Sequence, residues 1–123
     1  MAVTDTLYSR VGGYDAIAAM VENLLPRLTS DPQLGRFWKN RSHDGVRREK
    51  QLLIDFLSAS AGGPLLYVGR DMKTSHKGMN ISESDWTAFI GHLEATLDSF
   101  KVPANERTQV LAFVDSTKSD ILE

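Results

Sequence analysis

Apolar residues recur at helical spacing along most of the chain. Between residues 14 and 28 they fall three and four positions apart, on one stripe of a helix: Ile17, Met20, Val21, Leu24, Leu25 and Leu28. A second helix is predicted from Asp44, which can cap it, to Ala61, where the Gly-Gly-Pro sequence at 62–64 ends it. Two charges, Glu49 and Lys50, interrupt the apolar arc of this second helix. They call for an explanation in the folded protein.

The second half of the chain repeats the helical pattern. Ser82 and Asp85 form a capping-box variant. They precede a stripe predicted to be buried, made of Trp86, Phe89, Ile90, Leu93, Leu97 and Phe100. A fourth helix is predicted from Glu106 to Ile121, and short helices are expected at Leu7–Val11 and Asp71–His76. No segment alternates with period two for long enough to form a strand. The sequence therefore predicts an all-α fold, in a single domain that spans residues 1–123.

Composition narrows the classes of function. Hydrophobic residues make up 41% of the chain and charged residues 24%, which is typical of a globular protein. The net charge of -2, with both signs interspersed, favours neither nucleic acid nor an anionic membrane as a partner. The chain has no cysteine, no signal-peptide pattern and no apolar run near the roughly 18 residues that span a bilayer. A cytoplasmic location is expected.

His76 lies in an unusually long connection between two predicted helices. The segment from Gly62 to Ile81 exceeds the roughly 2 to 8 residues that usually join helices in a bundle. Met72 precedes His76 by four positions and shares its helical face. Tyr67 adds an aromatic ring, and Arg70 and Lys73 are two cations close to His76 in the sequence. An imidazole with cations and apolar side chains nearby would suit a flat apolar cofactor that carries iron and acidic groups. The alternative is an ordinary histidine in a plain helical bundle.

The other candidate sites are weaker. The spacings of His43 and His92 fit no zinc motif, and His92 is expected to be a half-buried structural residue while His43 is solvated. The chain contains no G-x-S-x-G sequence of a serine hydrolase. Its glycine pairs follow predicted helices and are typical of helix ends rather than of phosphate loops.

Several short motifs occur in a family's order. They are LYSRVGG at 7–13, DPQLGRFW at 31–38, AGGPLLYVGRDM at 61–72, His76, Ile81 and the His-Leu pair at 92–93. Together they resemble the truncated haemoglobins of the first group. The resemblance implies a two-over-two sandwich of helices around a haem, with His76 as the ligand of the iron. Because the chain has no cysteine for thioether links, a b-type haem held without covalent bonds is expected.

The resemblance also implies the residues around the haem. The expected lining comprises Phe37, Trp38, Leu53, Phe56, Leu57, Tyr67, Met72, Ile81, Trp86, Phe89 and Leu93. Arg70 and Lys73 match positions suited to the haem propionates. On the distal side, where a bound gas lies, Leu25 stands at the position of the family's tyrosine donor. Glu49, Leu52 and Leu53 stand where glutamine or another polar residue is common. Glu49 and Lys50 are expected near the pocket mouth, where they could reach a propionate, the bound ligand or the iron, or extend into water.

The resemblance implies reversible binding of dioxygen, nitric oxide or carbon monoxide at the iron. An enzymatic role as a nitric oxide dioxygenase or a peroxidase-like protein, or in nitrite chemistry, would involve a reductase as partner. Because hydrocarbon replaces the usual donors, weak binding of dioxygen is expected. A haem-based sensor and a haem-independent helical interaction module remain alternative functions.

Overall fold

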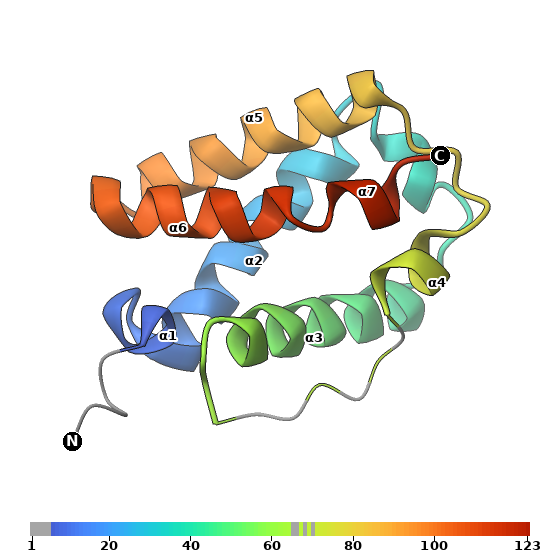
Figure 1. Cartoon of the computed structure of the whole chain (residues 1–123). Coiled ribbons are helices and arrows are strands. Elements are labelled where there is room, and N and C mark those ends of the chain that lie inside the picture. The colour runs from blue at the N-terminus through green and yellow to red at the C-terminus, as the bar shows by residue number, and fades with distance from the viewer. Residues whose placement is uncertain (1–5, 65–66, 68, 70) are drawn as a thin grey trace.

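The computed structural model describes residues 6–64, 67, 69 and 71–123. In chain order the helices are α1 (Leu7–Arg10), α2 (Gly13–Thr29), the 3-10 helix η2 (Gly35–Trp38), α3 (His43–Ser60), α4 (Met72–His76), α5 (Glu83–Ser99), α6 (Ala104–Asp115) and α7 (Lys118–Ile121). The described part of the chain contains no strand, so the predicted all-α class is confirmed (Figure 1). No helix within these ranges is both long and apolar enough to cross a bilayer.

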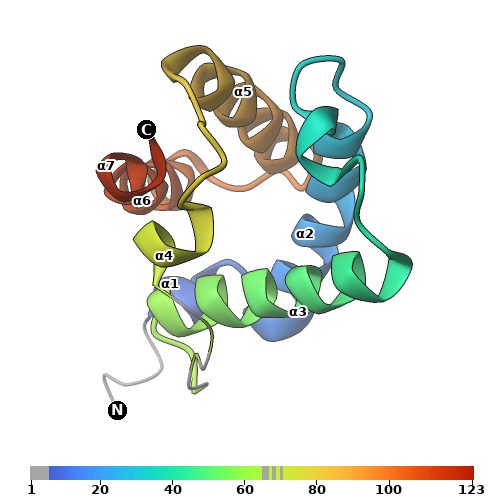
Figure 2. The same ribbon diagram turned by 90° about the vertical axis from the view of Figure 1, so that its right-hand side faces the viewer.

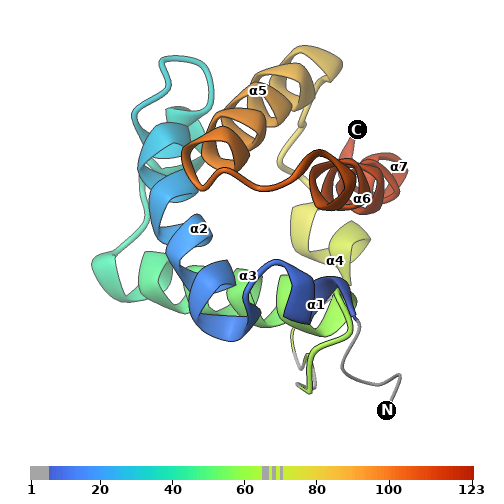
Figure 3. The same ribbon diagram turned by 90° about the vertical axis from the view of Figure 1, so that its left-hand side faces the viewer.

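The four longer helices form two pairs. Helix α2 packs on both α3 and α5, and α5 and α6 run above α3 in Figure 1. Figures 2 and 3 show α2, α3, α5 and the α6–α7 segment arranged around a central region, with the short α4 between α3 and α7. The larger apolar core joins these layers through Leu24, Leu28, Leu34, Trp86, Leu93, Leu97 and Val114. This two-over-two arrangement leaves the centre of the molecule bordered by every long helix.

The glycine pair at the end of α3 allows α1 to approach closely. The Tyr8 N–H donates to the carbonyl of Ala61 at 2.9 Å. A Cβ atom on Gly63 would lie 2.6 Å from the Tyr8 ring, and Gly62 has a φ of +96°, a left-handed conformation. Side chains other than hydrogen are disfavoured at both positions for these separate reasons. The predicted helix stop at Gly62 and Gly63 is confirmed.

The start of α3 differs from the sequence-based expectation. The hydroxyl oxygen of Ser42 accepts from the Gly45 N–H at 3.0 Å, so Ser42 caps the helix and Asp44 lies in its first turn. The predicted cap at Asp44 is therefore wrong by two residues. Its carboxylate still lies near the helix N-terminus, where the helix dipole favours a negative charge. By contrast, the predicted capping box of Ser82 and Asp85 on α5 is confirmed.

The predicted fourth helix is divided. Helix α6 ends at Asp115 and α7 begins at Lys118, so a single helix from Glu106 to Ile121 is wrong. The hydroxyls of Ser116 and Thr117 donate to the carbonyls of Phe113 and Val114, and the Thr117 N–H also donates to Val114. These bonds to residues three positions earlier compete with the regular helical pattern. The break redirects α7 toward α4.

Candidate functional site

The central region holds a cavity of about 230 Å³. Seven helices, η2 included, and three connections between helices contribute its walls: Leu25, Leu28, Leu34, Phe37, Trp38, Leu53, Phe56, Leu57, Met72, His76, Met79, Ile81, Asp85, Trp86, Phe89, Phe113, Val114, Thr117 and Ile121. Almost all of these side chains are apolar. A wide apolar cavity with very few polar groups is typical of a site for a large hydrophobic ligand.

The short helix α4 carries the only histidine of this lining. Its N-cap is Asp71, whose carboxylate accepts from the Thr74 N–H at 3.0 Å. The Nδ1 atom of His76 lies 2.8 Å from the carbonyl oxygen of Met72 and 3.0 Å from the Ser75 hydroxyl oxygen. A carbonyl only accepts, so Nδ1 must carry the proton and donate it. The Nε2 atom of neutral His76 therefore has a bare lone pair.

That lone pair is available for a ligand. Nε2 of His76 has no hydrogen-bond partner among the described residues. A neutral imidazole whose Nδ1–H is fixed by a backbone carbonyl is the usual form of a histidine that ligates a metal. The remaining two histidines are outside the cavity lining. His92 Nε2 lies 2.6 Å from an oxygen of Asp31, as expected for a half-buried structural residue, and His43 is exposed.

One part of the cavity consists of six side chains that we call the hydrocarbon wall: Leu25, Phe37, Trp38, Leu53, Phe56 and Leu57. Leu25 comes from α2, the two aromatic residues Phe37 and Trp38 from η2, and the others from α3. The rings of Phe37 and Trp38 meet edge to face at 6.4 Å. The indole N–H of Trp38 is the only hydrogen-bond donor among these six side chains. The wall thus brings together the predicted distal residues Leu25 and Leu53.

The two charges that interrupt the α3 arc lie outside the cavity lining. Glu49 forms an ion pair with Arg41, and Lys50 forms one with Glu22 on α2. The side chains of Glu49 and Arg41 are 37% and 45% exposed, so this pair is in contact with solvent. Each charge on the arc is therefore matched by an opposite charge on a neighbouring segment.

Three other predicted site residues that the structure describes are also outside the cavity lining. Tyr67 packs edge to face on Phe56, at 5.1 Å between ring centroids, and burial raises the pKa of its phenol. Lys73 is exposed on α4, and Leu93 is buried against a second cavity of about 70 Å³. Arg70 lies outside the described residues. The structure brings together the other members of the predicted lining.

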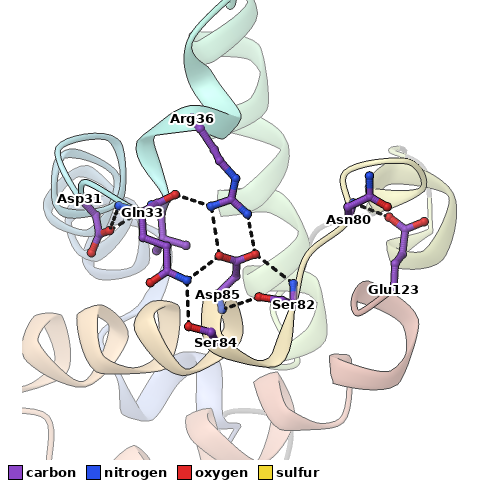
Figure 4. A network of polar contacts seen from close by, with 9 residues as sticks. Asp31, Gln33, Arg36, Asn80, Ser82, Ser84, Asp85 and Glu123 are labelled. Carbon is purple, nitrogen blue, oxygen red and sulfur yellow. Dashed lines mark hydrogen bonds and ion pairs between the residues drawn. The ribbon is translucent and has the colours of Figure 1, made fainter.

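A buried carboxylate anchors the rim between η2 and α5 (Figure 4). Asp85, 2% exposed, accepts from Arg36 Nη2 at 2.7 Å, from Gln33 Nε2 at 2.7 Å and from the Ser82 N–H at 2.9 Å. The Arg36 guanidinium is the main cause that holds the pKa of Asp85 well below its ordinary value. The same guanidinium lies 4.2 Å from the centre of the Phe37 ring. Arg36 thereby connects a fully partnered buried charge to the hydrocarbon wall.

Sequence reasoning missed eight residues of the lining: Leu28, Leu34, Met79, Asp85, Phe113, Val114, Thr117 and Ile121. The last four come from the α6–α7 segment and recur at helical steps. That periodicity is visible in the sequence, but it does not tell a cavity wall from an ordinary core. Asp85 was recognised only as part of a helix cap.

The chain is similar in sequence to known globins. The family model of bacterial-like globins matches residues 6–123. A group 1 truncated haemoglobin of Tetrahymena pyriformis is 31% identical over 117 residues, which cover 95% of this chain and 94% of the relative. The chain belongs to the group 1 truncated haemoglobins. A relative from Mycolicibacterium paratuberculosis is 31% identical over 89% of this chain and 78% of its own length.

Solved structures agree with this membership. The ferric truncated haemoglobin of Tetrahymena pyriformis superimposes with a TM-score of 0.87, at 30% identity, over 96% of this chain and 98% of the other. The two-over-two haemoglobin of Synechococcus, solved in the cyanomet state with covalently attached haem, gives a TM-score of 0.85 at 25% identity over 95% and 98%. The predicted truncated-globin fold is confirmed.

The residues of the cavity fit a haem. A haem presents two broad apolar faces and an iron that takes an axial nitrogen ligand. The cavity offers aromatic and aliphatic walls together with one neutral imidazole whose Nε2 is uncommitted. Among the described lining residues no second imidazole competes with His76.

Proposed function

We propose that this truncated haemoglobin holds one b-type haem in the central cavity and binds a diatomic ligand there: dioxygen, nitric oxide or carbon monoxide. When bound, the haem would supply an iron that can take a histidine nitrogen and a gas as ligands. The observation that carries the proposal is the fixed tautomer of His76. Its Nδ1–H donates to Met72 O, and Nε2 is left free to hold the iron within an apolar cavity.

The protein's own side chains account for the seating of the flat ring. Trp86 and Phe89 on α5 and Phe113 on α6 supply aromatic surface, and Met72 adds a polarisable side chain on the histidine helix. Lys73, which is exposed on α4, is proposed to form an ion pair with a haem propionate. Arg70 has the same proposed role from its sequence position alone.

The hydrocarbon wall favours redox or sensing roles over storage of dioxygen. Bound dioxygen draws negative charge and is stabilised by a donor, whereas carbon monoxide develops little charge. The five wall residues other than Trp38 offer no donor. We therefore propose weak dioxygen affinity relative to carbon monoxide and fast autoxidation. Turnover of nitric oxide, nitrite or peroxide with a cellular reductase is the enzymatic role that fits this pocket, and gas sensing is the second candidate.

The first test is the visible spectrum of the purified protein in its ferric and ferrous forms. An intense Soret band that disappears when acidic acetone removes the pigment is expected for a non-covalent b-type haem. Pigment that stays with the polypeptide would refute non-covalent binding. A chain that shows no Soret band, even after reconstitution with haem, would instead be a helical interaction module.

A further inference from the structure

One carboxylate holds the loop that leaves the histidine helix. The two side-chain oxygens of Glu123 accept separate backbone N–H groups, Gly78 at 3.0 Å and Asn80 at 2.8 Å. The Glu123 N–H in turn donates to the carbonyl of Ile81 at 3.1 Å. Figure 4 shows Glu123 beside Asn80. We call residues 78–81 the proximal loop, and Glu123 thus makes three hydrogen bonds across it.

The proximal loop has a conformation that needs support. Gly78 has a φ of +85° and Asn80 a φ of +56°, so two of its four residues are left-handed. Asparagine tolerates this region better than most residues, but the conformation still carries a cost. The bonds from Glu123 span both left-handed positions. The Gly78 and Asn80 N–H groups also hold the pKa of Glu123 below its ordinary value, which keeps it anionic.

The loop is directly connected to the cavity. The Met79 N–H donates to the carbonyl of His76 at 3.2 Å, and the side chains of Met79 and Ile81 line the cavity. Helix α4 has only five residues, too few for a helix to be stable by itself. Its position therefore depends on the segments to which it is attached, and α7, just before Glu123, packs against it.

We propose that Glu123 is a positioning residue for His76: by fixing the proximal loop it sets where the imidazole lies in the cavity. This inference rests on the proposed haem function, because the position of His76 matters only when Nε2 binds iron. Glu123 is not itself one of the residues that line the cavity. Its effect passes through the backbone of residues 78–81 and the short helix α4.

The chain offers a matched control. Asp120 is an exposed carboxylate on α7, the helix just before Glu123, and has no side-chain partner in the described part of the chain. Glu123→Ala removes both acceptors, and Glu123→Gln keeps the side-chain size but replaces one acceptor with a donor. Asp120→Ala removes a similar charge without affecting the loop. All three variants are made in the full chain.

Two measurements on the haem-loaded protein report on His76. The iron–histidine stretching band of the ferrous form is followed by resonance Raman spectroscopy, and haem loss is followed by transfer to apomyoglobin. For Glu123→Ala we expect a shifted or broadened band and roughly tenfold faster haem loss, as for one lost hydrogen bond to a charged group. Glu123→Gln should be intermediate and Asp120→Ala unchanged.

A third measurement does not depend on haem. Amide hydrogen exchange at Gly78 and Asn80 in the haem-free protein should accelerate in Glu123→Ala and not in Asp120→Ala. Accelerated exchange with an unchanged Raman band and unchanged haem loss would overturn the positioning role. Unchanged exchange would overturn the contact itself. A wild-type chain without a Soret band would refute the haem function separately, and Glu123→Gln decides the question if Glu123→Ala does not fold.

Discussion

The two sides of the central cavity are built on opposite principles. On the His76 side, polar contacts fix the backbone: Asp71 caps α4, Met72 orients the imidazole and Glu123 holds the proximal loop. Across the central region in Figures 2 and 3, α2 contributes Leu25 to a wall that has one donor among its six side chains. The first side fixes one nitrogen in place. The second leaves a ligand almost nothing to bond with.

This difference separates the tasks of the cavity. A metal ligand must keep one orientation, so directional hydrogen bonds around it are useful. A small gas is selected by what its surroundings offer, and a hydrocarbon surface offers a polar ligand no compensation for lost water. Glu49 and Lys50 form ion pairs with residues outside the cavity lining, so they add no polar group to the wall.

The largest effect is expected when the fixed nitrogen is removed. His76→Gly should abolish the iron–histidine band of the ferrous protein, because no second imidazole is among the described lining residues. Glycine in a short helix costs only about 1 kcal/mol, so the fold should persist by circular dichroism. Added imidazole should restore the spectrum. The control is His43→Gln, which changes an exposed histidine outside the cavity lining and should leave the band unchanged. If the iron is still bound by a histidine in His76→Gly, then His43 or His92 is the ligand instead.

A smaller but clear loss of stability is expected at the rim that supports the wall. Asp85→Asn should lower the free energy of unfolding at pH 7 by about 2 kcal/mol, because the buried site then lacks a charged acceptor for Arg36. The folded-state pKa of Asp85 is lowered, so its contribution is complete above the unfolded pKa of roughly 4 and is lost as the pH falls further.

Urea unfolding of wild type and Asp85→Asn at several pH values measures this contribution. The difference in free energy of unfolding between the two proteins should be largest at neutral pH and should decrease in acid. The control is Asp98→Asn, which removes a 65% exposed partner of Arg107 and should change little. If the difference in free energy of unfolding does not depend on pH, then packing rather than the ion pair is its cause.

The hydrocarbon wall is tested by giving it a donor. Leu25→Tyr should slow dioxygen release by about ten- to a hundredfold, the value of one hydrogen bond to a charged acceptor, with little change for carbon monoxide. Stopped-flow dissociation rates measure both gases. Slow release in wild type would indicate a donor already present, and the indole of Trp38 is then the candidate in the wall. Trp38→Phe would speed release in that case only.

The smallest effect is expected for the outward charge. Lys50→Ala removes an ion pair with Glu22, whose side chain is 58% exposed, so stability should change by less than about 1 kcal/mol. Dioxygen release should equal that of wild type, because Lys50 is not in the lining. The same stopped-flow assay measures dioxygen release from Lys50→Ala. Faster release than from wild type would mean that Lys50 leaves Glu22 and stabilises the bound gas inside the cavity.

Local chemistry made much of the fold predictable. The stripe on α2, the capping box at Ser82 and Asp85, and the stop at Gly62 and Gly63 each depend on residues within a few positions of one another. Errors arose where local alternatives compete. Ser42 and Asp44 are both good caps, and the hydroxyls of Ser116 and Thr117 ended a helix that hydrophobic periodicity alone would continue.

The sequence by itself determined the all-α class, the family and the singular position of His76, because spacing and motif order are properties of the chain. Only the tertiary structure decided which apolar residues face a cavity. It assigned Thr117 and Ile121 to the central cavity and Leu93 to the smaller one. It also decided that Glu123, 45 residues from Gly78, holds the proximal loop. Contacts between residues so far apart in the sequence are set by how whole helices pack, and no local sequence pattern predicts them.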